Sequence, residues 1–185
     1  MQIDFYSAGK NCFLIFTGLG GDTKGYENKY VKIAEAVTQK YGFSVFVAGV
    51  PKDCWSRPQE VFKEAVEHVL SECAPEKIYI MGSSAGASLA MWYSHLYPQI
   101  KKVLAVNPVL NLNYHRTKEG IQKFTGEKMF VEVGELDPCA VWVEALPAKD
   151  NVRAEVLKGV DHVITCKTEE FIALPDKTLY NKSII

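Results

Sequence analysis

The chain alternates short apolar runs with longer segments in which apolar residues recur every three or four positions. Each run is four or five residues long and apolar on both faces, which is typical of parallel β-strands covered by helices on either side. These predicted strands are residues 12–16, 44–48, 77–81, 103–106 and 129–133, with 154–157 as a sixth. Residues 2–6 alternate polar and apolar side chains, which favours a strand at an edge of the sheet.

The segments between the strands have helical periodicity. They predict helices at 28–41, 58–73, 85–97 and 137–146. In the second, Val61, Phe62, Ala65, Val66, Val69 and Leu70 form one apolar stripe. Strands that alternate with helices imply a three-layer α/β/α sandwich, with a mostly parallel central sheet and right-handed crossovers. In such sheets the chemistry lies outside the carboxyl ends of the strands.

Length, composition and charge narrow the classes of function. At 185 residues, without an internal repeat or a linker-like segment, the chain is expected to form a single domain over 1–185. Its formal net charge of −1 offers no attraction to nucleic acid or to an anionic membrane. It contains no apolar stretch as long as a membrane helix and no signal-peptide-like start. We therefore expect a soluble, cytoplasmic protein that binds neither nucleic acid nor membrane.

The cysteines do not predict a metal site or a disulfide framework. Five cysteines stand at positions 12, 54, 73, 139 and 166, an odd number with no close pair. None lies in a turn context that would lower a thiol pKa. We expect reduced thiols that are mostly buried, and neither a metal nor a cofactor.

The sharpest motif is Gly82-Ser83-Ser84-Ala85-Gly86, which follows a predicted strand and leads into a predicted helix without a loop. Such a turn forces its corner residue into strained backbone angles and requires small neighbours, here Gly82 and Gly86. This is the G-x-S-x-G nucleophile elbow, with Ser84 as nucleophile and Ser83 as spacer. The alternative is a plain strand-to-helix turn with small residues.

A serine hydroxyl needs a base, and four histidines are available: His68, His95, His115 and His162. The first two lie within predicted helices, where a solvated or packed histidine is the ordinary explanation. His162 follows the last predicted strand and a turn glycine, so it is expected at the carboxyl edge. His115 follows another strand end and is its competitor.

The acid that orients the histidine should also follow a late strand. Asp137 comes four residues after the last valine of the strand at 129–133, in a turn closed by Pro138. The same position suits a helix N-cap, and both roles can hold at once. Glu135 and Asp161 are weaker alternatives.

A glycine-rich segment, 18–21, begins at the carboxyl end of the first buried strand. Its backbone N–H groups can face a ligand, and the N–H of Leu19 is the candidate second donor to an oxyanion, beside that of Ala85. A phosphate-binding loop is the rival interpretation, but the segment lacks the P-loop lysine and the spacing of a dinucleotide fingerprint.

Taken together, these residues make the chain, from about residue 13 to about residue 167, resemble the α/β-hydrolase superfamily of serine esterases, lipases, thioesterases and related acyl hydrolases. The resemblance depends on the elbow, on the order Ser84, Asp137, His162, on the turn at 134–138 and on the glycine loop. It implies the α/β-hydrolase fold and, near the end of the chain, a final helix, for which 168–174 is the short remnant before Pro175.

The sequence departs from many relatives at two places. Thr17 stands where they have a histidine before the oxyanion-loop glycine. Only about 20 residues, Val109 to Lys128, separate the strands at 103–106 and 129–133, where relatives often carry a lid domain. Any lid is therefore expected to be rudimentary.

The sequence predicts a serine hydrolase that cleaves a small carboxylic ester or thioester through an acyl-enzyme on Ser84. The alternatives are a serine peptidase or acyltransferase that uses the same three residues, and a non-catalytic binding protein. Tyr114, Phe124 and Trp142 are predicted near the strand ends, where they could line an acyl or alcohol pocket or simply pack.

Overall fold

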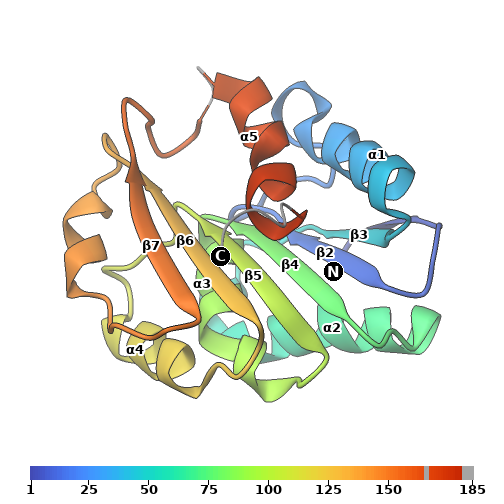
Figure 1. Cartoon of the computed structure of the whole chain (residues 1–185), viewed down its shortest axis with the longest axis horizontal. Helices are drawn as coiled ribbons and strands as arrows, with labels where there is room; N and C mark the ends of the chain where they lie inside the picture. Colours follow the sequence, from blue (N-terminus) through green and yellow to red (C-terminus); the bar gives the residue numbers. More distant parts are fainter. Residues whose placement is uncertain (165–166, 181–185) are drawn as a thin grey trace.

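The computed structural model describes residues 1–164 and 167–180, and it contains the predicted α/β/α sandwich (Figure 1). The sheet formed by these residues has seven strands in the order β1-β3-β2-β4-β5-β6-β7. β1 pairs antiparallel with β3 at one edge, and the other neighbours are parallel. The strands are β1 (Ile3–Tyr6), β2 (Cys12–Phe16), β3 (Ser44–Ala48), β4 (Ile78–Ser83), β5 (Ile100–Val106), β6 (Lys128–Gly134) and β7 (Val152–Leu157).

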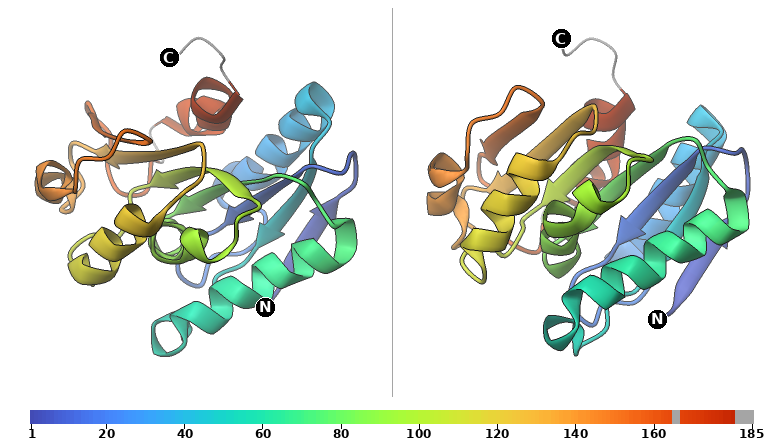
Figure 2. Two further views of the ribbon diagram at one scale, coloured as in Figure 1. Left: turned by 60° about the horizontal axis from the view of Figure 1, so that its bottom comes forward. Right: turned by 90° about the horizontal axis from the view of Figure 1, so that it is seen from below.

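In the described part of the chain, five α-helices cover the two faces of the sheet. α1 (Lys29–Tyr41) and α5 (Thr168–Pro175) lie on one face, whereas α2 (Pro58–Cys73), α3 (Ala85–Tyr93) and α4 (Tyr114–Lys123) lie on the other (Figure 2). Shorter 3-10 helices follow at Tyr26–Asn28, Cys54–Ser56, Ser94–Leu96 and Ala140–Ala145.

The central strands are buried on both faces, as their continuous apolar runs predict. Along β2 the side chains alternate, so Leu14 and Phe16 join the core beneath α2 and α3, while Phe13 and Ile15 join the core beneath α1 and α5. All four are fully buried. This double burial holds the strand ends rigidly, and the loops that follow them start from fixed positions.

Two predictions about helices were wrong. The predicted helix at 137–146 is only the 3-10 helix Ala140–Ala145, because residues 137–139 form a turn in which the N–H of Cys139 donates to the Asp137 carboxylate. Helix α4 was not predicted at all. Its buried residues are only Thr117, Gly120 and Ile121, too thin an apolar stripe to stand out in the sequence.

The segment between β5 and β6 forms no lid. Its helix α4 packs against α3, where the indole Nε1 of Trp92 donates to Oγ1 of Thr117 at 2.9 Å.

After β7, α5 continues as a π-helical turn, Asp176–Tyr180, rather than stopping at Pro175. The predicted thiol at Cys166 lies outside the described residues; Cys12, Cys54 and Cys139 are buried free thiols, and Cys73 is half-buried.

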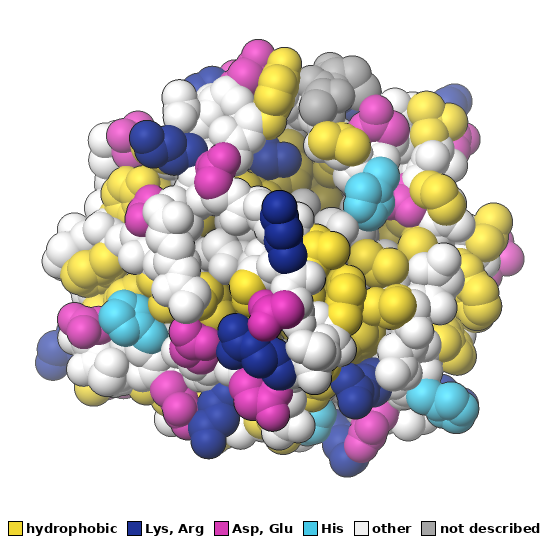
Figure 3. Space-filling view, turned by 180° about the vertical axis from the view of Figure 1, so that it is seen from behind, with side chains coloured by type: hydrophobic (Ala, Val, Ile, Leu, Met, Phe, Trp, Pro, Cys, Tyr) yellow, Lys and Arg dark blue, Asp and Glu magenta, His cyan; other side chains and the backbone are white. Residues whose placement is uncertain are grey.

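The outer surface over α2 and α4 carries charges of both signs side by side (Figure 3). Ion pairs one helical turn apart account for part of this pattern, Lys63 with Glu67 at 3.4 Å and Lys123 with Glu119 at 2.5 Å. Among the helices of the described residues, none combines the length and the apolar composition that crossing a bilayer requires.

Candidate active site

The turn between β4 and α3 places a hydroxyl at the carboxyl edge of the sheet. Ser84 is the residue between the two elements, with φ 52° and ψ −114°. A non-glycine residue in this region is strained, and it persists only where the surroundings impose it. Here the N–H of Ser84 donates to the carbonyl of Val106 at 2.9 Å, which fixes the corner to the neighbouring strand β5.

The glycines of the motif are required by close approach. A Cβ at Gly82 would lie 2.4 Å from the carbonyl oxygen of Gly86, and a Cβ at Gly86 would lie 2.5 Å from the carbonyl oxygen of Thr17. Both distances are far below van der Waals contact, so only hydrogen fits at either position. The predicted need for small residues on both sides of Ser84 is confirmed, and the second contact shows that Gly86 also sets the distance between α3 and the segment after β2.

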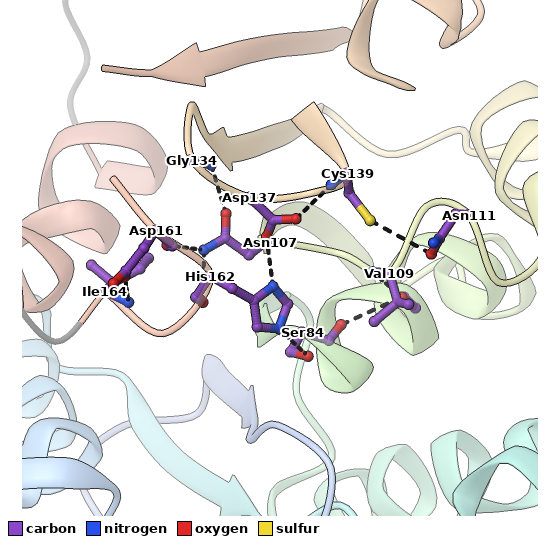
Figure 4. A network of polar contacts seen from close by, with 11 residues as sticks. Ser84, Asn107, Val109, Asn111, Gly134, Asp137, Cys139, Asp161, His162 and Ile164 are labelled. Carbon is purple, nitrogen blue, oxygen red and sulfur yellow. Dashed lines mark hydrogen bonds and ion pairs between the residues drawn. The ribbon is translucent and has the colours of Figure 1, made fainter. Parts of the chain in front are cut away.

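His162 is the histidine that the fold brings to Ser84. Its Nε2 lies 2.9 Å from the Ser84 hydroxyl oxygen, and its side chain is 40% exposed (Figure 4). The competitor His115 lies on the exposed side of α4. His68 packs edge-on against Phe46, and His95 lies in the 3-10 helix after α3, where burial lowers its pKa.

The acid beside His162 is Asp137. Its Oδ2 lies 2.5 Å from Nδ1 of His162, its Oδ1 accepts from the N–H of Cys139 at 2.7 Å, and its side chain is 1% exposed. One carboxylate therefore both caps its own turn and orients the imidazole. If Nδ1 carries the proton that Asp137 accepts, Nε2 is free to accept the proton of Ser84.

The two alternative acids are engaged elsewhere. The Glu135 carboxylate accepts from the N–H of Gly159 at 2.9 Å. The Asp161 carboxylate accepts from the N–H of Ile164 at 2.7 Å, and so it closes the turn that carries His162. Both side chains shape the loop after β7 rather than contacting the imidazole nitrogens.

The glycine loop lies directly against the elbow. A Cβ at Gly18 would stand 3.7 Å from Cβ of Ser84. The N–H groups of Gly20 and Gly21 donate to Val50 and Gly18, but within residues 1–164 and 167–180 no carbonyl accepts from that of Leu19. Ala85 is the first residue of α3, so its N–H has no intrahelical acceptor either. Within the described residues, neither the Leu19 nor the Ala85 amide has a backbone acceptor.

Thr17, in the place of the expected histidine, closes this loop through its side chain. Its hydroxyl accepts from the N–H of Val50 at 3.1 Å and lies 3.1 Å from the carbonyl oxygen of Gly18 and 3.2 Å from that of Gly21. It is fully buried. The Thr17 hydroxyl therefore holds the loop folded back on itself.

Tyr30, on α1, is a further residue of the site that sequence reasoning missed. Burial raises its pKa to about 12, opposed by hydrogen bonding of its hydroxyl with the Ser83 side chain and the Gly18 backbone. The buried side chain of Tyr30 thus lies beside both the spacer of the elbow and the glycine loop. Its apolar helical spacing in the sequence identifies Tyr30 only as a core residue.

The predicted pocket residues have different outcomes. Phe124 is buried at the opposite end of the sheet, where β5 begins. Its position follows from Gly126: a Cβ added there would contact both the Phe124 ring and the carbonyl oxygen of Ile100, the first residue of β5. Its prediction as a lining residue was wrong, since it follows the missed helix α4. Tyr114 and Trp142 lie on segments that follow β5 and β6, with ring centroids 5.8 Å apart, and the Tyr114 hydroxyl donates to the carbonyl of Ala145.

Comparison with solved structures identifies the fold, whereas comparison of the sequence finds no close relative. No protein-family model and no curated protein matches this sequence. Est1E from Butyrivibrio proteoclasticus superposes with a TM-score of 0.75 at 13% identity, covering 96% of this chain and 91% of that one. An α/β serine hydrolase without a lid, from Xanthomonas campestris, gives 0.70 at 15% identity over 96% and 87%. The esterase domain of a Rhodothermus marinus protein gives 0.65 at 12% identity over 97% and 96%. The sheet order, the turn at Ser84 and these neighbours agree, and the chain therefore has the α/β-hydrolase fold, in a form without a lid domain.

Proposed function

We propose that this protein is a serine hydrolase that cleaves a small carboxylic ester or thioester. The observation that carries the proposal is the continuous hydrogen-bonded series from Ser84 Oγ through the ring of His162 to Asp137 Oδ2, with distances of 2.9 and 2.5 Å. Such a series activates a hydroxyl for attack on a carbonyl, since the imidazole can take the proton as the oxygen–carbon bond forms.

In the first half of the reaction, Ser84 Oγ attacks the carbonyl carbon and its proton passes to Nε2 of His162. Asp137 holds the ring in the required tautomer and stabilises the imidazolium. The negative charge on the carbonyl oxygen is held by the N–H groups of Leu19 and Ala85, each worth roughly 3 kcal/mol in comparable sites. Collapse of the tetrahedral intermediate breaks the bond to the alcohol or thiol, which leaves with the proton from His162.

In the second half, water attacks the acyl group on Ser84. His162 takes a proton from the water and returns it to Oγ, so that the carboxylic acid leaves and the serine is regenerated. The exposure of His162 supports this step, because 40% of its side chain is open to solvent. The lidless fold supports a small, soluble substrate.

A fluorophosphonate probe tests the proposal directly, because it labels only activated serine nucleophiles. We expect one label, mapped to Ser84, in the wild type and in Ser71→Ala, which removes an exposed hydroxyl on α2. Ser84→Ala should take up none. A wild-type protein that stays unlabelled would overturn the hydrolase proposal in favour of a binding protein.

The reaction class is separated by substrate. A series of nitrophenyl esters and thioesters of rising acyl length, set against aminoacyl nitroanilides, reports the bond that is cleaved. We expect ester or thioester turnover that is lost in Ser84→Ala. Turnover of the amides alone would assign a peptidase, and acyl transfer to an added alcohol in preference to water would assign an acyltransferase.

A further inference from the structure

Asn107 is a buried polar residue at the carboxyl end of β5, outside the three residues of the proposed mechanism. It is fully buried and has φ 48°, a left-handed conformation that asparagine tolerates better than most residues. Its main-chain N–H donates to the carbonyl of Glu132 in β6 at 2.8 Å. The side chain is thereby held in the space between the ends of β5, β6 and β7.

The side-chain amide of Asn107 makes three hydrogen bonds. Its Oδ1 accepts from the N–H of Gly134 at 2.7 Å, and its Nδ2 donates to the carbonyl oxygens of Asp161 at 3.0 Å and His162 at 2.9 Å (Figure 4). Gly134 begins the turn that carries Asp137. The two carbonyls belong to the turn that carries the imidazole. One amide therefore links the backbone of the acid turn to the backbone of the histidine turn.

The same residue is also adjacent to the elbow. Val106, its neighbour in the chain, accepts the hydrogen bond from the N–H of Ser84. The nucleophile, the acid and the base thus belong to three loops whose backbones all meet at 106–107. Val106 and Asn107 therefore connect the three loops through their hydrogen bonds.

The chemistry of these contacts requires an amide. The site offers one N–H donor and two carbonyl acceptors, and an asparagine side chain supplies the matching acceptor and two donors. An aspartate of the same shape could accept from Gly134 but would face both carbonyls without a proton to donate. Because Asn107 is fully buried, the loss of these hydrogen bonds is costly.

We propose that Asn107 is a positioning residue for the triad, which sets the distance between His162 and the Ser84 hydroxyl by fixing the backbone of both the acid and the histidine turns. This inference rests on the proposed hydrolase function. A misplacement of about 1 Å at a reacting group costs on the order of 100-fold in rate. The residue contacts no substrate in this mechanism, so its removal should lower kcat and leave KM unchanged.

The test compares Asn107→Asp, which keeps the shape and removes both donors, with Asn107→Gly, which removes the side chain and accepts the positive φ. Asn113→Asp is the control for the added charge: Asn113 caps α4 by accepting from the N–H of Arg116, and aspartate can accept the same bond. Each protein is assayed for kcat, KM and the rate of fluorophosphonate labelling, and for the NMR signal of the proton between His162 Nδ1 and Asp137.

We expect kcat and the labelling rate to fall about 100-fold in both Asn107 variants, with KM unchanged and the His162 signal lost, while Asn113→Asp matches the wild type. Folded Asn107 variants that are less stable but keep kcat and the His162 signal would show a purely structural residue and overturn the inference. A wild type that takes up no label would overturn the hydrolase proposal itself. Equal labelling of the wild type and the Asn107 variants would instead overturn only the positioning role of Asn107.

A measurement on the wild type covers the case in which neither variant folds. Phosphonylation of Ser84 breaks its hydrogen bond to His162, so the side-chain amide signal of Asn107 should shift if the two are coupled. An amide signal that stays in place on phosphonylation would overturn the inference without any substitution.

Discussion

The hydroxyl oxygen of Ser84 lies 2.9 Å from Nε2 of His162, although 78 positions separate the two residues in the chain. Nothing local to either loop produces this contact. It arises because β4 and β7 are both parallel members of one sheet, with β5 and β6 between them, so that the loops after them emerge at the same edge. The contact is therefore a property of the strand order, and the chemistry depends on the order being kept.

Replacement of His162 should remove the base without disturbing the sheet. In His162→Ala we expect fluorophosphonate labelling and ester turnover to fall by about 10³-fold or more, because the serine keeps its proton. His115→Ala is the control, since it removes an exposed imidazole from α4. Gel fluorescence measures the labelling rates of the two variants. An active His162→Ala protein would show that another group takes the proton from Ser84.

Asp137→Asn changes the tautomer rather than the shape of the site. An amide can accept from the Cys139 N–H and keep the turn, but its NH₂ group can donate to the imidazole and favour the tautomer with the proton on the nitrogen facing Ser84. We expect kcat to fall by about 10³- to 10⁴-fold with the thermal midpoint nearly unchanged. Glu135→Gln, which keeps an acceptor for the Gly159 N–H, should retain activity. Equal activity of the two variants would remove Asp137 from the mechanism.

The features that could be predicted from the sequence are those set by local requirements. The strand positions follow from apolar runs that are buried on both faces, as at Phe13 and Leu14. The elbow follows from the absence of room for a Cβ at Gly82 and Gly86. The positions of Asp137 and His162 at one edge follow from their places after late strands, because parallel strands end on the same side.

The features that could not be predicted depend on tertiary contacts. Helix α4 has few buried residues, so its apolar stripe is weak in the sequence, and Phe124 at its end was assigned to the wrong end of the sheet. The role of Asn107 needs three backbone partners from two other loops, none of which is near it in the sequence. A polar residue immediately after the buried run at 103–106 was the one available signal.

Because Gly86 is closely packed, we expect one added methyl group at this position to lower the stability of the fold strongly. In Gly86→Ala the Cβ would lie 2.5 Å from the Thr17 carbonyl oxygen and 2.6 Å from Cβ of Phe16. The helix and the glycine loop must separate, so we expect a loss of about 3 kcal/mol in the free energy of unfolding. Labelling at Ser84 should also be lost, because the N–H of Leu19 moves away from it.

The control for this variant is Gly42→Ala. Gly42 ends α1 with φ 66°, and in the described part of the chain no heavy atom lies within 4 Å of a Cβ built there. Only backbone strain of about 1 kcal/mol is expected, with normal labelling. Urea unfolding and probe labelling of the two variants give the comparison; similar losses in both would show that close packing at Gly86 is unimportant.

The raised pKa of Tyr30 leads us to expect that the stability of the folded protein falls at alkaline pH. Its buried hydroxyl has a pKa raised from 10.0 to about 12, chiefly by burial, because the ionised form would lose its hydration. The unfolded chain releases this proton at lower pH than the folded one. The neutral hydroxyl therefore contributes stability that is complete below pH 10 and is lost as the pH rises through the folded pKa.

In Tyr30→Phe this pH-dependent contribution disappears. Between about pH 9 and pH 11 we expect the wild type to lose roughly 1 kcal/mol of unfolding free energy relative to Tyr30→Phe, as the linkage of one pKa requires. Urea unfolding at the two pH values measures it. Tyr26→Phe, which removes a hydroxyl from a ring that is 55% exposed, is the control and should run parallel to the wild type. If the gap between wild type and Tyr30→Phe is the same at both pH values, the Tyr30 hydroxyl is hydrated in the folded protein and burial does not raise its pKa.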